Sequence, residues 1–427
     1  MTKESLFGHI VEAYAAFTQR AHIPADAVLR DYFRARKYLG ARDRRSIAIP
    51  YYETVRNYLR LEAIVIDVTS SEELDPALVI GAAFIVLFGE DPKDVRLILA
   101  RMPNQFAYEY TPEIVGAIGD REREERRLAA LDPIERLSIE QSMPLWFVSE
   151  LVEEYGKEDA TSLLVASNKE ATVSLRANTL VMSRDQVLKM LQKTGLDARP
   201  SAVASDGILL PKRINVLEFG EFRRGGFEIQ DESSQLVAPF ADIHSNRLRI
   251  LDVCAGAGGK SLHFAALLGG KGEITATDID PYKLTEMKKR VKRSTAQNIR
   301  IVMPDEQEKY LGADKDGTFD VVLLDVPCTG TGTLRRNPSI KWHLTDQMHE
   351  ELLEKQRMIV ERNLRFLKPG GVLLYSTCSL LRTEGEEQTQ WIEQTYPDLN
   401  EEATMRTRPD IDGADGFFVS RLRKSDA

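Results

Sequence analysis

Apolar positions at the start of the chain recur with the period of an amphipathic helix. Between residues 6 and 17 they fall about every 3.6 residues, at Leu6, Ile10, Tyr14 and Phe17. A similar period runs through residues 47–59. The charged stretch at 120–132 then lacks bulky apolar side chains before Leu128, as an exposed connector does. We therefore predict an all-helical domain over residues 1–137.

The pattern changes twice further along the chain. Over residues 138–230, helix-like segments alternate with short strand-like ones such as ATVSLRAN and DGILLP, which predicts a small α+β linking subdomain. From residue 231, near-continuous apolar strands alternate with helix-length segments, as in LRILDVC, GEITATDID and FDVVLLDVPC. Such strands are typical of a mostly parallel sheet with helices on both faces. We predict a Rossmann-like α/β domain over residues 231–427, with ligands at the carboxyl ends of its strands.

The composition is that of a globular protein, because 43% of the 427 residues are apolar and 29% are charged. The longest apolar run, at 77–89, is shorter than the ~20 residues that cross a bilayer. We expect a buried helix there and no membrane partner. The three cysteines are widely spaced and show no zinc-binding pattern. We therefore expect free thiols, no metal and a cytoplasmic protein.

The net charge of −9 argues against general binding to nucleic acid, but basic residues gather locally. Residues 30–60 carry nine bases against three acids, and the segment 288–293 reads KKRVKR. These clusters, with Arg335, Arg336 and Lys341, predict contacts to phosphate groups, and a solvated helix face is the alternative. For Trp342 the sequence favours packing over stacking on a base.

The first strand of the α/β domain ends in a glycine-rich turn, CAGAGGKS at 254–261. This turn lacks one glycine of a P-loop, at Cys254, and the third glycine of a dinucleotide-binding turn, at Ser261. What remains is a turn whose backbone a ligand can approach, and a helix start that favours a negative group such as a carboxylate. A purely structural tight turn is the alternative.

Acidic residues close the next two strands. Asp278 follows the glycines by about 20 residues, the offset at which a carboxylate usually binds ribose hydroxyls. Asp305 closes the following strand and is a candidate to bind an adenine amino group, with a surface acid as the alternative. A nucleoside with a carboxylate tail fits S-adenosyl-L-methionine better than NAD, which carries a pyrophosphate.

Several longer segments resemble one known family. LDVCAGAGGKSLHFAALL, VLLDVPCTGTGTLRRNPSIKW, LLYSTCSLLRTEGEEQ and DGFFVSRLRK resemble successive motifs of the Sun-type (NOL/Sun) RNA cytosine-C5 methyltransferases. The helical region around LGARDRRSIAIPYYETVRNYLRLEAI is similar to the NusB-like RNA-binding domain of the bacterial member that acts on 16S rRNA. The resemblance covers most of the chain. It implies S-adenosyl-L-methionine as the cofactor and RNA, in particular small-subunit rRNA, as the partner.

The resemblance also implies roles for residues at the strand ends. Carbon 5 of cytosine is a poor nucleophile, and a thiolate that adds to C6 turns the ring into an enamine able to attack a methyl group. In the family the cysteine of the Thr-Cys-Ser motif, here Cys378, attacks, and the Pro-Cys cysteine, here Cys328, promotes release. Asp325 is expected to contact the cofactor or the base, and Lys260 to orient this network. The implied cofactor-binding residues are Cys254, Ala255, Gly256, Ala257, Gly258, Gly259, Lys260, Asp278, Asp305 and Asp325.

The cofactor turn departs from the family at one position, because Ala257 stands where a proline is common. Loss of proline loosens the turn without removing a ligand, so cofactor affinity is affected more than reaction type. For Cys254, the alternative to a role in cofactor binding is that it simply packs beneath the turn. We expect a monomeric methyltransferase that takes a cytosine out of its stack in RNA. Two alternatives stay open: a non-catalytic RNA-binding or ribosome assembly factor with a vestigial site, and a nicotinamide-dependent dehydrogenase.

Overall fold

The computed structural model describes residues 1–102, 109–211 and 214–426 of the chain. Two compact units make up the structure. The first, the helical unit, contains Met1–Asn168 and Leu334–Asp346, and the second, the sheet unit, contains Lys169–Thr333 and Gln347–Ala427. The last residue of the predicted α/β domain, Ala427, lies outside the described residues.

Helices form all the regular structure described in the helical unit. Four of them begin with a proline directly after an Asp or Thr whose side chain accepts a backbone N–H. Proline suits the first helical turn, and the cap satisfies an otherwise unpaired donor. The helices are α1 (Lys3–Thr18), α2 (Ala25–Ala35), α3 (Ala41–Arg56), α4 (Tyr58–Thr69), α5 (Pro76–Val86), α6 (Pro92–Leu99), α7 (Pro112–Ile118), α8 (Arg121–Ala129), α9 (Pro133–Gln141), α10 (Leu145–Tyr155) and α11 (Lys157–Ser167).

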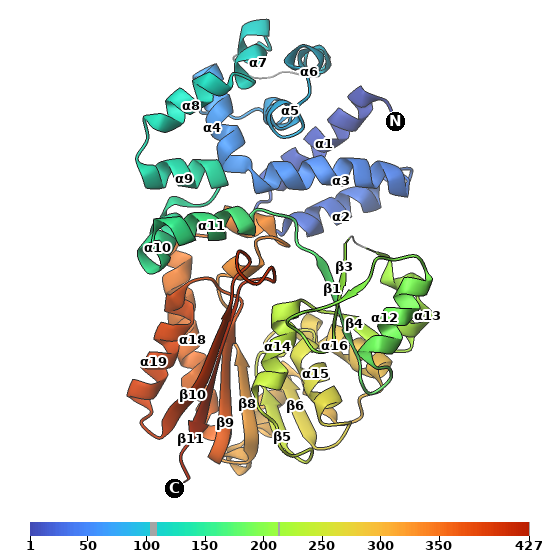
Figure 1. The fold of residues 1–427 in the computed structure, drawn as a ribbon, viewed down its shortest axis with the longest axis vertical. Helices are drawn as coiled ribbons and strands as arrows, with labels where there is room; N and C mark the ends of the chain where they lie inside the picture. The colour runs from blue at the N-terminus through green and yellow to red at the C-terminus, as the bar shows by residue number, and fades with distance from the viewer. Residues whose placement is uncertain (103–108, 212–213, 427) are drawn as a thin grey trace. The chain divides into compact units, whose positions relative to one another are not determined.

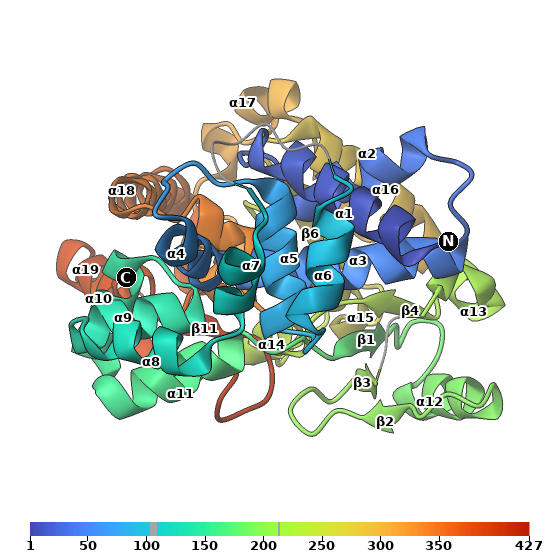
Figure 2. The ribbon, with the colours of Figure 1, turned by 90° about the horizontal axis from the view of Figure 1, so that it is seen from above.

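Helix α5 is the apolar centre of the helical unit. Eight of its residues are buried. It packs against α1, α3, α4, α6 and α7, and Figure 2 shows α1 and α6 beside it. A helix that is apolar all round has to be covered on all sides. The buried helix predicted at 77–89 is therefore confirmed up to Val86, whereas Phe88 lies beyond the helix and is exposed.

The segment Leu334–Asp346, here named the strap, packs in the helical unit although it follows the Pro-Cys motif in sequence. Its short helix η5 (Pro338–Trp342) lies against α3. Trp342 stacks on Tyr58 with 4.2 Å between ring centroids, and its ring N–H donates to the Val55 carbonyl at 3.1 Å. Lys341 is 1% exposed, and its ammonium donates to the Arg56 carbonyl at 2.8 Å. Trp342 therefore packs, as predicted, but Lys341 does not face RNA phosphate.

The sheet unit begins with a small α+β subdomain. Its four strands pair antiparallel in the order β2-β3-β1-β4. The elements are β1 (Val173–Ala177), α12 (Arg184–Lys193), β2 (Arg199–Pro200), β3 (Gly207–Leu210), η1 (Val216–Glu218), α13 (Gly220–Arg223) and β4 (Phe227–Ile229).

A seven-stranded sheet follows, in the order β10-β11-β9-β8-β5-β6-β7. The pairs from β9 to β7 are parallel, whereas β11 and β10 add antiparallel strands at one edge. Its elements are α14 (Glu232–Phe240), β5 (Arg249–Asp252), α15 (Gly259–Leu267), β6 (Glu273–Thr277), α16 (Pro281–Ser294), β7 (Ile299–Val302), η2 (Pro304–Glu306), α17 (Gln307–Tyr310), η3 (Ala313–Lys315), β8 (Phe319–Asp325), η4 (Thr331–Thr333), α18 (Asp346–Asn363), η6 (Leu364–Phe366), β9 (Leu367–Thr377), η7 (Arg382–Glu384), α19 (Glu386–Thr395), β10 (Leu399–Thr407) and β11 (Phe417–Lys424).

Helices cover both faces of this sheet (Figure 1). Leu323 of β8 packs in one core with Phe264 of α15, and Leu324 packs in another with Val360 of α18. Successive strand residues point to opposite faces, so the near-continuous apolar pattern of β8 reflects burial on both sides. The predicted fold class is confirmed, and the domain limits at residues 137 and 230 stay a prediction.

Candidate active site

Two cysteine-bearing loops leave the same edge of the sheet. β8 and β9 are parallel neighbours whose register pairs Asp325 with Ser376. Cys328 and Cys378 follow these paired residues within a few positions. Their Sγ atoms lie 3.5 Å apart, and both side chains are half-buried. The structure thus brings together the two thiols that the sequence singles out.

Cys328 is held in its neutral form. Its pKa lies well above the usual value for a thiol, first because it hydrogen-bonds with Cys378 and then because burial disfavours the thiolate. Negative charge on Cys378 and Glu384 acts in the same direction. A neutral thiol is a weak nucleophile and a potential proton donor. Cys328 therefore keeps its proton at neutral pH.

An ion pair lies at the same strand ends. Lys260, in the first turn of α15, donates to Oδ2 of Asp325 at 2.6 Å, and the Ser376 hydroxyl donates to Oδ1 at 3.0 Å. Burial alone would lower the pKa of Lys260, but the charge of Asp325 and the hydrogen bond to it bring that pKa above its ordinary value. Lys260 is therefore a fixed cation that orients the Asp325 carboxylate.

The glycine turn forms one wall of a cavity of about 250 Å³. Gly258 has a φ of +82°, and a Cβ there would lie 2.6 Å from the Met287 side chain, so glycine is required. Helix α15 begins directly after it, with its first N–H groups at the turn. Seven predicted cofactor-binding residues line the cavity: Cys254, Ala255, Gly256, Ala257, Gly259, Lys260 and Asp325.

The other predicted acids lie differently. Asp278 does not line the cavity but holds its turn, because Oδ2 accepts the Gly256 N–H at 2.8 Å. Its Oδ1 accepts the Asp280 N–H at 2.8 Å. Asp305 is exposed in η2 and does not line the cavity. Burial raises the pKa of the Cys254 thiol, so this cysteine is a lining residue rather than a reactive one.

The cavity offers the donor set that the amino-acid end of S-adenosyl-L-methionine requires. Arg290 lines it and supplies a cation for a carboxylate. One oxygen of Asp252, Oδ1, is buried and has no hydrogen-bond partner among the described residues, so it can accept from an ammonium. At Gly256 a Cβ would meet open space, so the backbone of the turn is accessible. The residues present therefore fit this cofactor.

Several residues that hold the site are not apparent in the sequence. Ser376 precedes the Thr-Cys motif without any signal, and Glu384 reads as a solvated acid before a helix. Arg290 belongs to the basic segment 288–293, yet it pairs with Glu228 at 3.1 Å, and Arg293 pairs with the same carboxylate at 2.7 Å. Burial alone distinguishes these residues from polar and charged residues at the surface, and burial depends on tertiary packing.

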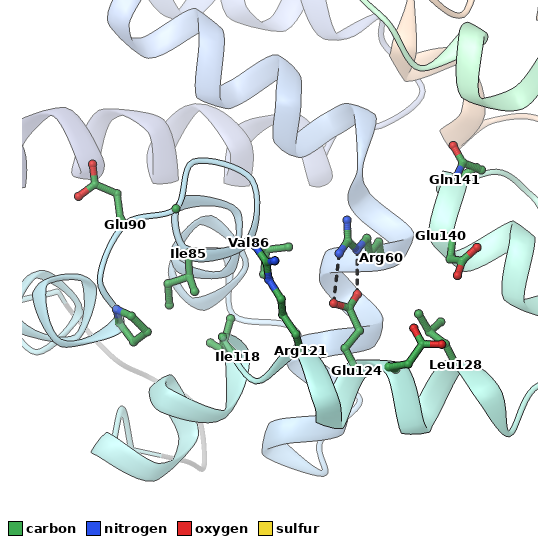
Figure 3. Close-up of a pocket in the computed structure, with 14 residues that line it drawn as sticks. Arg60, Ile85, Val86, Glu90, Ile118, Arg121, Glu124, Leu128, Glu140 and Gln141 are labelled. Carbon is green, nitrogen blue, oxygen red and sulfur yellow. Dashed lines mark hydrogen bonds and ion pairs between the residues drawn. The ribbon is translucent and has the colours of Figure 1, made fainter.

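A larger cavity, of about 720 Å³, lies in the helical unit. Arg60 is paired with Glu124 at its wall (Figure 3). The guanidinium donates to the two carboxylate oxygens at 2.8 and 3.1 Å. Arg56, from the same basic segment, is 4% exposed and donates to the Leu334 and Arg335 carbonyls. Both arginines therefore have partners within the helical unit. The lining residues of this larger cavity include neither a thiol nor a glycine turn, so its size does not mark the site of chemistry.

Residues 1–102, 109–211 and 214–426 contain neither a candidate metal centre nor a membrane-spanning helix. No three His, Cys, Asp or Glu side chains in these ranges are grouped so that they could hold a metal ion. Across the same ranges, no helix is both long enough and apolar enough to span a bilayer.

The mostly parallel sheet, the glycine turn and the strand-end acids define a Rossmann-like cofactor-binding domain, the fold that S-adenosyl-L-methionine-dependent methyltransferases share. The family described as 16S rRNA methyltransferase RsmB/F matches residues 242–423. The RsmF/B-like ferredoxin-like domain matches residues 143–217. The chain is 32% identical over 311 residues to the probable ribosomal RNA small subunit methyltransferase B of Bacillus subtilis, a match that covers 69% of each chain. The chain therefore belongs to the RsmB/F family.

Solved structures share the fold. The crystal structure of PH0851 is 23% identical, with a TM-score of 0.78 and 99% coverage of both chains. A methyltransferase homolog from Pyrococcus horikoshii is 27% identical, with a TM-score of 0.60 over 69% of this chain and 100% of that one. Family membership excludes the dehydrogenase alternative, and S-adenosyl-L-methionine is the cofactor.

Proposed function

We propose that this chain transfers a methyl group from S-adenosyl-L-methionine to carbon 5 of a cytosine in small-subunit rRNA, through a covalent adduct between Cys378 and C6. The observation that carries this proposal is the 3.5 Å approach of two thiols beside the Lys260–Asp325 pair. One thiol suffices to attack the ring, and a second is useful when the adduct has to be resolved. The relative from Bacillus subtilis is a probable ribosomal RNA small subunit methyltransferase, which supports rRNA as the substrate class.

The first half of the reaction uses Cys378, Asp325 and Lys260. The Cys378 thiol gives up its proton as its sulfur adds to C6 of the cytosine, the ring electrons move toward N3, and N3 takes up that proton. Asp325 accepts the hydrogen bond of the protonated N3, while Lys260 holds the carboxylate in place. Bound S-adenosyl-L-methionine supplies an electrophilic methyl group that the nucleophilic C5 attacks.

The second half uses Cys328. The C5 proton has to leave and the bond between Cys378 and C6 has to break so that the ring regains its double bond. Cys328 gives its proton to the departing Cys378 sulfur and then receives the C5 proton. Cys328 ends as the neutral thiol with which it began, Cys378 regains the proton that it lost, and N3 releases its proton to solvent, which is the one net proton of the reaction. Its proximity to Cys378 serves this exchange.

The remaining site residues hold the cofactor. The turn 254–259 presents its backbone, Arg290 binds the carboxylate and Asp252 accepts from the amino group. Asp278 acts by holding the turn and remains the candidate for the ribose. We keep Asp305 as the candidate for the adenine amino group, although it is exposed and does not line the cavity.

The test is the identity of the methylated nucleoside. Small-subunit rRNA is incubated with the protein and isotope-labelled S-adenosyl-L-methionine, digested and analysed by mass spectrometry. We expect label in 5-methylcytidine with the wild type and none with Cys378→Ala. Label in another nucleoside would overturn the cytosine-C5 assignment. RNA binding without any transfer would favour the non-catalytic assembly factor.

A further inference from the structure

A buried carboxylate lies behind the Pro-Cys loop. Glu384, at the end of η7, is 0% exposed. It accepts the backbone N–H of Thr329 at 2.9 Å and also the hydroxyl of that residue. The side-chain amide of Gln356, from α18, donates to it at 3.0 Å. Since Thr329 directly follows Cys328, Glu384 ties the loop of one cysteine to the segment that follows the other.

The donors that meet this carboxylate are neutral. A buried carboxylate costs much free energy unless several donors or a cation compensate it, and here the Thr329 and Gln356 donors do so. Gln356 is held in turn, because it also donates to the Pro327 carbonyl and accepts the Tyr375 hydroxyl at 3.1 Å each. The network therefore fixes both the position of Cys328 and a negative charge close to it.

Other titratable and charged groups lie on the elements near Glu384 and Cys328. The Lys260–Asp325 ion pair lies at the strand ends from which the two cysteine loops leave. The His349 ring lies 2.9 Å from the hydroxyl of Thr383, which precedes Glu384. The neighbouring elements supply Lys260 of α15, Asp325 of β8, Tyr375 of β9, His349 and Arg357 of α18, and Arg406 of β10. Of these, Tyr375 touches Glu384 itself, through a hydrogen bond from its hydroxyl to the Glu384 carbonyl at 3.0 Å.

We propose that Glu384 is the positioning residue that keeps Cys328 a protonated thiol and thereby leaves the role of nucleophile to Cys378. The proposal rests on the function proposed above for the two cysteines. A thiolate at Cys328 would add a second negative charge beside a buried carboxylate and would lose its S–H donor to Cys378. The direction of the Cys328 pKa, raised in part by Glu384, agrees with this geometry.

The test measures thiol reactivity in the protein without RNA or cofactor. Wild type and Glu384→Gln are alkylated with iodoacetamide from pH 6 to 10, and each cysteine is followed by peptide mass spectrometry. Glutamine keeps the shape of the side chain but removes the charge. We expect the Cys328 profile to move to lower pH by about one unit, which is about a tenfold faster reaction at pH 8. Glu387→Gln, which neutralises an exposed acid three residues on, is the matched control and leaves the profile unchanged.

Two outcomes would overturn the proposal. One is a Cys328 profile in folded Glu384→Gln that coincides with the wild-type profile. The other is faster alkylation of Cys328 than of Cys378 at pH 8 in the wild type. This outcome can be measured even if Glu384→Gln does not fold. Neither depends on methyl transfer. A shifted profile in a protein that never methylates RNA would refute the proposed function while the role of Glu384 in setting the Cys328 proton stands.

Discussion

At the scale of single residues, burial changes what an acid can do. Asp252 closes β5, is 1% exposed, and accepts the Ser261 hydroxyl through one oxygen at 2.6 Å. Burial raises its pKa to about 7, with a lesser contribution from the charge of Asp325. In an unfolded chain an aspartic acid titrates near pH 4. Between about pH 4 and pH 7, the folded state therefore holds a proton that the unfolded state has lost.

This difference predicts how stability depends on pH. The free energy of unfolding falls as pH rises through that window, by about 1.4 kcal/mol for each pH unit that the Asp252 proton accounts for. Asp252→Asn removes the contribution, so its stability declines less between pH 4 and 7 than that of the wild type. Denaturant titrations at several pH values measure the effect, with Asp305→Asn, an exposed acid, as control. Parallel curves for wild type and Asp252→Asn would contradict the account.

The sequence reveals the residues that end strands but not those that support them. Cys328, Cys378 and Asp325 follow apolar runs, and parallel strands place such residues at one edge of the sheet. The structure brings them together with Lys260. Glu384 has no such signal, because an acid before a helix is ordinarily a solvated cap. Its burial depends on how the η7 segment packs on α18, which no local pattern specifies.

Among the structural elements, the strap is one whose packing partner could not be predicted from the sequence pattern. Three bases of the thirteen-residue strap, Arg335, Arg336 and Lys341, predict contacts to RNA phosphate, yet the strap belongs to the helical unit, where Lys341 is buried. Lys341 donates to backbone carbonyls there, and burial takes its pKa well below the ordinary value for lysine. The partner of a short segment is set by long-range docking, and hydrophobic periodicity does not report it.

The strap also predicts a stability effect. Trp342 contacts Tyr58 and also packs edge-on against Phe17, at 5.0 Å between ring centroids. Trp342→Ala removes this packing and leaves a cavity, so we expect the helical unit to lose about 3 kcal/mol of unfolding free energy. Denaturation followed by circular dichroism measures it. Tyr38→Ala, at a side chain that is 73% exposed, serves as the control with little effect. Equal stability of the two variants would show that the strap is not packed as described.

At the scale of the whole molecule, the chain passes from the sheet unit into the helical unit and back. It leaves after Thr333, five residues beyond Cys328, and returns at Gln347. The order of helical, α+β and α/β regions along the chain follows from changes in hydrophobic period. The parallel pairing of β5 to β9 follows from their near-continuous apolar sequences. That the strap belongs to the helical unit does not follow from the sequence pattern. A linear division of the sequence assigns each residue to the domain of its neighbours.

A denaturing gel of protein incubated with S-adenosyl-L-methionine and small-subunit rRNA distinguishes the roles of Cys328 and Cys378. We compare wild type, Cys328→Ala and Cys378→Ala for a covalent band of protein and RNA. We expect a strong band with Cys328→Ala, because the adduct forms but is not resolved, and none with Cys378→Ala. A band that persists in Cys378→Ala and vanishes in Cys328→Ala would reverse the roles of the two thiols and contradict the account.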